Sequence, residues 1–131
     1  MTYARSTSKL RGCVVSIAIM AMAIAILWSF AVGYLPMQPF DSGKWKAVKS
    51  SSDHSRLRMV EPFLLTHRIN GVPKQEIVDL LGPGDETSYF NDWDAVYWLG
   101  PERSFFSLDS EWLVIRFGPD GKVIDHRIVR D

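Results

Sequence analysis

The sequence predicts an α+β domain, with two N-terminal helices packed on a three-stranded antiparallel sheet, preceded by a single transmembrane helix. Three observations support this prediction. An uncharged apolar run occupies residues 13–35, an apolar stripe of helical period lies at residues 77–81, and alternating segments flank a Gly-Pro-Asp-Gly turn at residues 118–121. The predicted organisation is a basic N-terminal segment at 1–12, an anchor at 13–35, a linker at 36–52 and a domain at 53–131.

The apolar run is long enough to cross a bilayer, which takes about 20 residues at about 1.5 Å each. Its Val, Ile, Leu and Phe side chains favour insertion by about 3–6 kcal/mol in total. A cleaved secretory signal is the alternative, because three basic residues precede the run and residues 29–31 (Ser-Phe-Ala) fit a cleavage site. The length of the run favours an uncleaved single-pass anchor.

Charge gives a weaker indication of membrane orientation, because the two sides of the run carry equal numbers of basic residues. These residues are Arg5, Lys9 and Arg11 before the run, and Lys44, Lys46 and Lys49 after it. No acidic residue precedes Asp41, which favours an internal N-terminus and an external domain. Cleavage near Ala31 would instead release a secreted or periplasmic product.

The composition of residues 36–131 argues against a nucleic-acid partner. This part has twelve basic and fifteen acidic residues, a net charge of −3, whereas nucleic acid favours a basic patch. The Lys-rich stretch at residues 44–49 is a local exception, and it has two interpretations: contact with anionic lipid headgroups, or a solvated linker. The single cysteine, Cys13, excludes an intrachain disulfide.

Two helices are expected at the start of the domain. Leu57, Val60 and Leu64 have helical spacing after Asp53, although Pro62 would either kink this helix or begin it. A second helix is predicted with Pro73 at its first position and an apolar stripe at residues 77–81; Gly82 and Pro83 then end it.

Three strands are expected in the second half. Residues 95–99 are rich in strand-favouring types, residues 112–117 alternate between apolar and polar faces, and residues 122–129 alternate again after the turn. The apolar face of this hairpin needs a cover, which the two helices supply.

The domain resembles the SmpA/OmlA (BamE-like) family over roughly residues 56–130. The matching segments are Gly71, Ile77-Val78, Leu81-Gly82-Pro83, Tyr97-Trp98-Leu99-Gly100, Leu113 to Phe117 and Asp120 to Val123. The resemblance implies a small envelope domain that binds protein, as the accessory lipoprotein of the outer-membrane barrel assembly machinery does. The family's lipoproteins carry a cysteine that closes the signal, whereas here the apolar run serves as a protein anchor. The expected location is therefore the inner membrane, with a periplasmic domain.

No constellation typical of catalysis or metal binding occurs in the sequence. His54, His67 and His126 lack the spacing of a metal site, and the serines have no neighbouring base. The Gly-Pro-Gly-Asp sequence at residues 82–85 follows a helix and lacks the ending of a phosphate loop. We therefore expect a protein that is not an enzyme, with no cofactor, no metal and no small-molecule substrate.

Aromatic residues crowd into residues 89–112 and are the candidate partner site. Phe90, Trp93, Phe105 and Phe106 lie in predicted loops, and aromatic side chains anchor protein interfaces at low entropic cost. Alternatively, they close the open side of the sheet. The expected function is a membrane-anchored, protein-binding envelope domain that supports envelope or outer-membrane assembly. The alternative is an inhibitor or immunity-type binder of an enzyme, on the fold that β-lactamase inhibitor proteins share.

Overall fold

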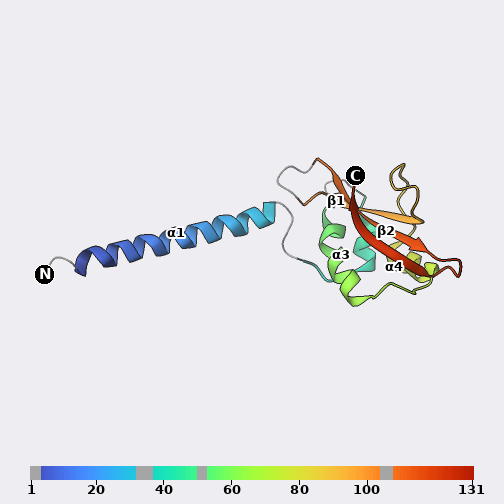
Figure 1. The fold of residues 1–131 in the computed structure, drawn as a ribbon, viewed down its shortest axis with the longest axis horizontal. Coiled ribbons are helices and arrows are strands. Elements are labelled where there is room, and N and C mark those ends of the chain that lie inside the picture. Colours follow the sequence, from blue (N-terminus) through green and yellow to red (C-terminus); the bar gives the residue numbers. More distant parts are fainter. Residues whose placement is uncertain (1–3, 32–36, 50–52, 104–107) are drawn as a thin grey trace.

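The computed structural model describes residues 4–31, 37–49, 53–103 and 108–131. These residues form four helices and three strands (Figure 1). The helices are α1 (Ala4–Ala31), α2 (Ser42–Ala47), α3 (Ser55–Thr66) and α4 (Lys74–Leu81), and the strands are β1 (Ala95–Pro101), β2 (Ser110–Phe117) and β3 (Val123–Arg130). The α+β class and the antiparallel sheet are as predicted, but the domain has one helix more than expected.

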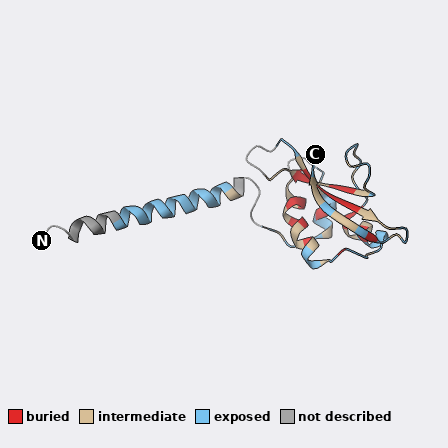
Figure 2. Ribbon diagram, in the orientation of Figure 1, coloured by how far each residue is buried: buried red, intermediate tan, exposed pale blue. Residues whose placement is uncertain are grey.

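Helix α1 contains the apolar run and extends away from the domain (Figure 1). Its Arg11–Ser29 portion is long and apolar enough to cross a membrane, a property that secretory signals share. No described side chain of α1 is buried, and its long pale blue stretch in Figure 2 consists of exposed residues. The last part of the predicted anchor, residues 32–35, lies outside the described residues.

The three strands form an antiparallel meander in the order β1-β2-β3. Tyr97 pairs with Leu113 and Leu113 pairs with Ile128, so these three side chains lie on one face. Because side chains alternate along a strand, Val96, Val114 and their neighbours point to the opposite face. We call the face toward the helices the inner face and the other the outer face.

The main core lies between the inner face and helices α2, α3 and α4. Its buried residues are Trp45, Leu57, Met59, Val60, Phe63, Ile69, Ile77, Leu81, Tyr97, Leu99, Leu113, Ile115 and Val123. The two expected helices therefore cover the sheet as the hairpin's apolar pattern requires. Buried positions gather at this helix–sheet boundary (Figure 2).

The predicted linker at residues 36–52 needs correction, because α2 lies within it and belongs to the domain. Trp45 of α2 is fully buried in the core. The Asp41 carboxylate caps the helix by accepting from the Lys44 amide at 2.8 Å, and the Ser42 hydroxyl donates to the Leu80 carbonyl at 2.6 Å. Helix α2 has six residues and one buried apolar side chain, which is too few to show a helical period in the sequence. The sequence pattern therefore predicted a tether, whereas contact with the rest of the domain stabilises a helix.

Helix α3 runs from Ser55 to Thr66 with Pro62 inside it, so the alternative that the main helix begins at the proline is wrong. Proline has no amide hydrogen to donate to the carbonyl four residues earlier, at Arg58. The Gln38 amide donates to that carbonyl instead, at 3.1 Å. Because of the proline, the Arg58 carbonyl is available to the Gln38 amide, and this hydrogen bond connects the segment before α2 to α3.

The remaining element ends differ from prediction by two residues or fewer. Pro73 is the cap of α4 and pairs with Lys122 as an isolated bridge, so the helix begins at Lys74. Gly82 follows α4 with φ of 81°, in agreement with the expected left-handed stop. A β-bulge between Trp98 and Gly100 lets β1 run on to Pro101.

Candidate partner-binding surface

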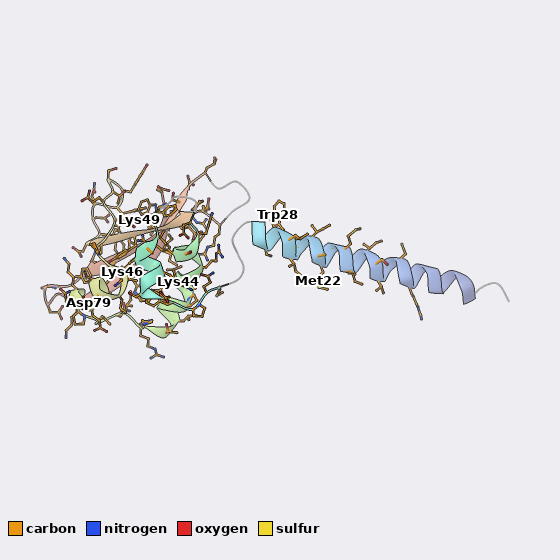
Figure 3. All side chains as sticks on the ribbon, turned by 180° about the vertical axis from the view of Figure 1, so that it is seen from behind. Met22, Trp28, Lys44, Lys46, Lys49 and Asp79 are labelled. Atoms are coloured by element: carbon orange, nitrogen blue, oxygen red, sulfur yellow. The ribbon has the colours of Figure 1, made fainter. Side chains whose placement is uncertain are left out.

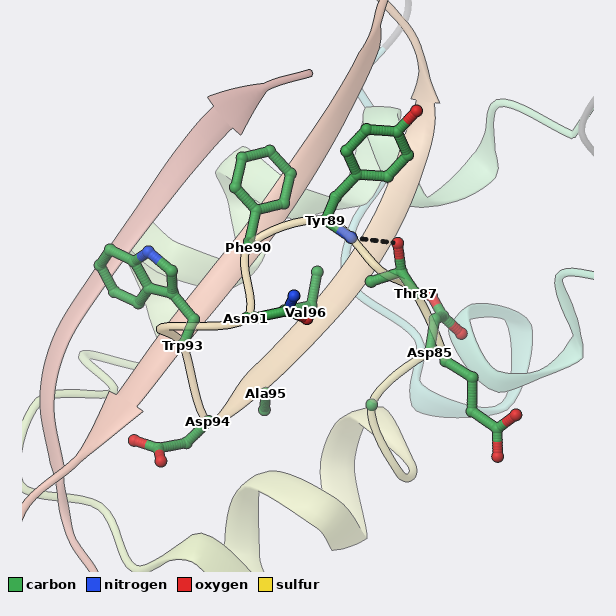
Figure 4. A pocket seen from close by; sticks show the side chains of 11 residues that line it. Asp85, Thr87, Tyr89, Phe90, Asn91, Trp93, Asp94, Ala95 and Val96 are labelled. Carbon is green, nitrogen blue, oxygen red and sulfur yellow. Dashed lines mark hydrogen bonds between the residues drawn. The ribbon is translucent and has the colours of Figure 1, made fainter.

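The outer face of the sheet carries a second apolar cluster that none of the described helices covers. Val96, Trp112 and Val114 form its buried centre, and Phe90, Trp93, Trp98 and Val129 pack against them while remaining partly exposed. Phe90 and Trp93 come from the segment 85–94, which we call the aromatic loop, and this loop folds back over the strands (Figure 4). An apolar sheet face on which, among the described residues, only a loop packs offers a place for a partner to add a further layer.

Both ends of the aromatic loop are hydrogen-bonded to the sheet. At one end, the Asp85 amide donates to the Val96 carbonyl at 2.8 Å, and the Asp85 carboxylate accepts from the Trp98 amide at 2.8 Å. At the other end, the Asp94 carboxylate accepts from the Phe117 amide at 2.7 Å. These bonds fix the loop ends, so its aromatic side chains are held against the outer face.

Phe90 and Trp93 form a turn inside this loop. The Trp93 amide donates to the Phe90 carbonyl at 2.9 Å, and Phe90 has a φ of 58°, the left-handed region that non-glycine residues rarely adopt. This conformation places the Phe90 ring 6.1 Å from that of Trp112. Both predicted site residues are half-buried, so they partly close the open side of the sheet, as the alternative expectation had it.

Trp93 also stacks with two cations from the neighbouring strands. The Arg116 guanidinium lies 4.5 Å from the Trp93 ring centroid, and that of Arg127 lies 5.7 Å from it. Arg116 further donates to the Asp92 carbonyl at 3.1 Å. An indole in contact with two guanidinium groups gives the outer face an amphipathic rim of the kind that protein interfaces favour.

Tyr89 is the most exposed aromatic residue of the loop, with 54% of its surface accessible. Its ring lies 6.2 Å from that of Trp112, and its amide is held by the Thr87 hydroxyl at 3.1 Å. Beside it, the aromatic loop and the start of β1 line an open hollow of about 410 Å³ (Figure 4). The surface therefore combines an exposed ring with a recess that a partner side chain could enter.

The other two predicted site residues, Phe105 and Phe106, lie outside the described residues. The base of their loop is described. The buried Glu111 carboxylate accepts from the Arg103 amide at 3.0 Å and pairs with its guanidinium at 2.8 Å. This loop follows the end of β1 at Pro101, whereas the aromatic loop joins its start at Ala95. Phe90 and Trp93 are thus brought together on the outer face, next to the start of β1.

An ion pair lies beneath the aromatic loop and links it to the core. Arg56, which is 6% exposed, donates to Asp85 at 2.6 Å and to the carbonyls of Trp45 at 3.0 Å and Trp98 at 3.1 Å.

Burial, together with the nearby Asp85 carboxylate, raises the pKa of Tyr97 to about 12. Hydrogen bonds from Ser55 lower the pKa of Asp53 at the start of α3. These groups serve packing and helix capping.

Two of the histidines, His67 and His126, take part in local packing and hydrogen bonding among the described residues. No group of three or more His, Cys, Asp or Glu side chains there is placed to hold a metal ion. His67 contacts Thr66 and the rings of Phe40 and Phe63, and His126 hydrogen-bonds Asn70 at 3.0 Å. The geometry of the aromatic surface is suited to contact with a protein.

Sequence analysis identified Phe90 and Trp93 as residues of this surface and did not identify the others. Tyr89 shares the crowded aromatic segment and would have followed from the same signal. Arg116 and Arg127 could not be found, because their proximity to Trp93 depends on the pairing of β2 with β3. Comparison with known proteins gives no further guidance, since no family model, curated protein or solved structure matches this chain.

Proposed function

We propose that this chain is a membrane-anchored, non-catalytic binding domain of the bacterial cell envelope, and that its aromatic outer face contacts a protein partner. The observation that carries the proposal is the incompletely covered outer face: Tyr89 is 54% exposed beside the hollow of about 410 Å³, and the Trp93 ring is in contact with two arginines. Tyr, Trp and Arg are the residue types that contribute most to binding energy at protein interfaces.

Two further features support the location and the class. Helix α1 has the length and composition of an anchor, which would hold the domain at the inner membrane. The domain's helices on one face of a three-stranded meander agree with the architecture that the BamE-like resemblance implies. A fold-level likeness does not transfer function by itself, so the partner is to be identified from the surface.

Site-specific photo-crosslinking tests this proposal in native membranes. A benzophenone amino acid placed at Tyr89 should give a discrete adduct on irradiation. The same probe at Glu76, which is exposed on α4 away from the outer face, should give none. The proposal fails if position 89 gives no adduct, or if both positions give the same one.

The identity of the adduct separates the two classes of binder. A component of the outer-membrane assembly machinery or another envelope protein supports the assembly role. A single toxin or hydrolase supports the inhibitor or immunity-type alternative. In either case, replacing Trp93 with Ala should reduce the adduct at position 89, because it removes the ring that stacks with Arg116 and Arg127.

A further inference from the structure

Helix α2 presents three lysines from a rigid position on the domain. Lys44 and Lys46 lie in the helix and Lys49 follows it, and all three side chains are exposed (Figure 3). We call these three residues the lysine surface. The helix itself is fixed, because Trp45 is fully buried and its carbonyl accepts from the Arg56 guanidinium at 3.0 Å.

No ion pair among the described residues neutralises the lysines of this surface. Lys46 donates to the backbone carbonyl of Asp79 at 2.7 Å, while Lys44 and Lys49 form no side-chain hydrogen bond or ion pair with the described residues. Three acidic side chains belong to the surroundings. Asp41 accepts from the Lys44 backbone amide as the helix cap, Asp79 accepts from the Gln75 side-chain amide at 3.0 Å, and Asp85, which lines a hollow together with Lys46, is paired with Arg56.

The distribution of charge along the chain is strongly uneven. Residues 53–131 carry nine basic and fourteen acidic side chains, a formal net charge of −5, whereas residues 37–49 carry three lysines and one aspartate, a net charge of +2. An anionic surface would therefore repel the body of the domain and attract the side that bears α2. The domain has a charge polarity with which such a surface could orient it.

The connection to α1 keeps the lysine surface near a membrane. Ten residues, 32–41, separate the end of α1 at Ala31 from the start of α2 at Ser42. Even a fully extended chain of that length spans only about 35 Å. A group tethered so closely has a high effective concentration at the bilayer surface, so weak electrostatic attraction suffices for contact.

We propose that the lysine surface docks on the anionic headgroups of the bilayer that holds α1, and so orients the domain with its α2 side toward the lipid. The aromatic outer face, on the other side of the sheet, is then directed away from the bilayer and accessible to a partner. The proposal rests on α1 remaining attached, and it is independent of which protein the outer face binds.

Energy transfer in nanodiscs tests this docking with the full-length protein and lipid alone. In a Cys13→Ala background, a donor dye is placed at Ala47→Cys on α2 or at Ser88→Cys on the aromatic loop, with an acceptor dye on the headgroups. When the lipid changes from neutral phosphatidylcholine to a mixture with about 30% phosphatidylglycerol, transfer from position 47 should rise and transfer from position 88 should not. High salt should reverse the rise.

Charge variants test whether the lysines are responsible. Lys44→Gln with Lys49→Gln should lower the ratio of docked to undocked protein about 10- to 30-fold. Lys74→Gln with Lys122→Gln removes the same charge from two other exposed positions and should leave the ratio nearly unchanged. The proposal is overturned if transfer from position 47 does not depend on anionic lipid, or if the two double variants behave alike.

Folding and partner binding are monitored separately from docking. The near-ultraviolet circular dichroism of each variant should match that of the parent, because the replaced side chains are exposed and outside the core. Loss of docking with an intact crosslink at Tyr89 would refute only the lipid contact. A missing crosslink with intact docking would refute only the partner surface.

Discussion

Arg56 is the residue on which the packing of three elements depends. Its guanidinium joins the Trp45 carbonyl of α2, the Trp98 carbonyl of β1 and the Asp85 carboxylate of the aromatic loop. Removing one partner of a buried ion pair leaves an uncompensated charge, which costs about 3–5 kcal/mol. Asp85 retains 34% side-chain exposure, so we expect Asp85→Ala to lower the free energy of unfolding by about 2–4 kcal/mol. Urea denaturation in mild detergent, followed by tryptophan fluorescence, measures this change.

Asp92→Ala is the matched control for that prediction. Asp92 also pairs with an arginine, Arg116, but at 3.6 Å and with 76% side-chain exposure. Exposed pairs contribute little, so its loss should change stability by less than about 0.5 kcal/mol. Equal effects of the two substitutions would show that burial of Arg56 is not what makes its pair important.

Tyr97 should make the domain sensitive to alkaline pH. Its hydroxyl donates to the Gly82 carbonyl at 2.9 Å, and burial raises its pKa from 10.0 to about 12. The folded pKa lies above the unfolded one, so this contribution to stability is complete below pH 10 and is lost as pH rises toward 12. Thermal unfolding between pH 9 and about 12 should therefore show a decline that Tyr97→Phe reduces.

A spectroscopic titration checks the same residue directly. Absorbance at 295 nm should show a tyrosinate step near pH 12 in the folded protein, and Tyr97→Phe should remove it. At neutral pH that variant should also lose about 1 kcal/mol, because the buried Gly82 carbonyl loses its donor. A titration unchanged by the substitution would contradict the assignment.

At the scale of elements, α2 determines where the domain begins. Trp45 fills the core between α3 and α4, and its ring lies 6.1 Å from that of Phe63 and 6.3 Å from that of Tyr97. We expect Trp45→Ala to destabilise the domain by about 3–5 kcal/mol through loss of burial and the cavity left behind. Lys44→Ala, at an exposed position of the same helix, should change stability by less than about 0.5 kcal/mol.

Truncation tests the same boundary. A chain beginning at Met37 should fold, whereas one beginning at Asp53 lacks α2 and the Gln38 bond to Arg58, and should unfold at much lower urea concentration. Equal midpoints for the two truncated chains would restore the interpretation of residues 36–52 as a tether.

These elements also show which parts of the fold the sequence could predict. Helix α4 and the β2–β3 hairpin could be predicted from the spacing of their apolar residues and from the positions of glycine and proline, because their own residues determine these elements. Helix α2 did not, since six residues with one buried tryptophan become helical only against α3 and α4. Likewise Phe90 and Trp93 were identified as aromatic residues in a turn, but their contact with the outer face depends on Asp85 and Asp94 binding separate strands.

At the scale of the whole molecule, the charges and the apolar helix act together. The first turns of α1 and the α2 segment after it are basic, and the body of the domain is acidic, with a net charge of −5 over residues 53–131. Helix α2, which carries the lysine surface, packs on the inner side of the sheet, whereas Phe90 and Trp93 pack on the outer face, so lipid contact and partner contact need not compete. Everything in this arrangement requires that α1 stays in the bilayer and is not removed.

Retention of α1 can be tested by a substitution that changes only the energy of insertion. The apolar side chains of the run favour insertion by about 3–6 kcal/mol, and each Arg at the centre of a span costs about 2.5–3.5 kcal/mol. Ile19→Arg with Ile24→Arg should therefore cancel the gain, and the protein should leave the membrane pellet during alkaline carbonate extraction. Ile19→Leu with Ile24→Leu should stay in the pellet, with the intact mass of 14.9 kDa. A parent protein that is found in the aqueous fraction and begins near Val32 would contradict the anchor and would favour the cleaved-signal alternative.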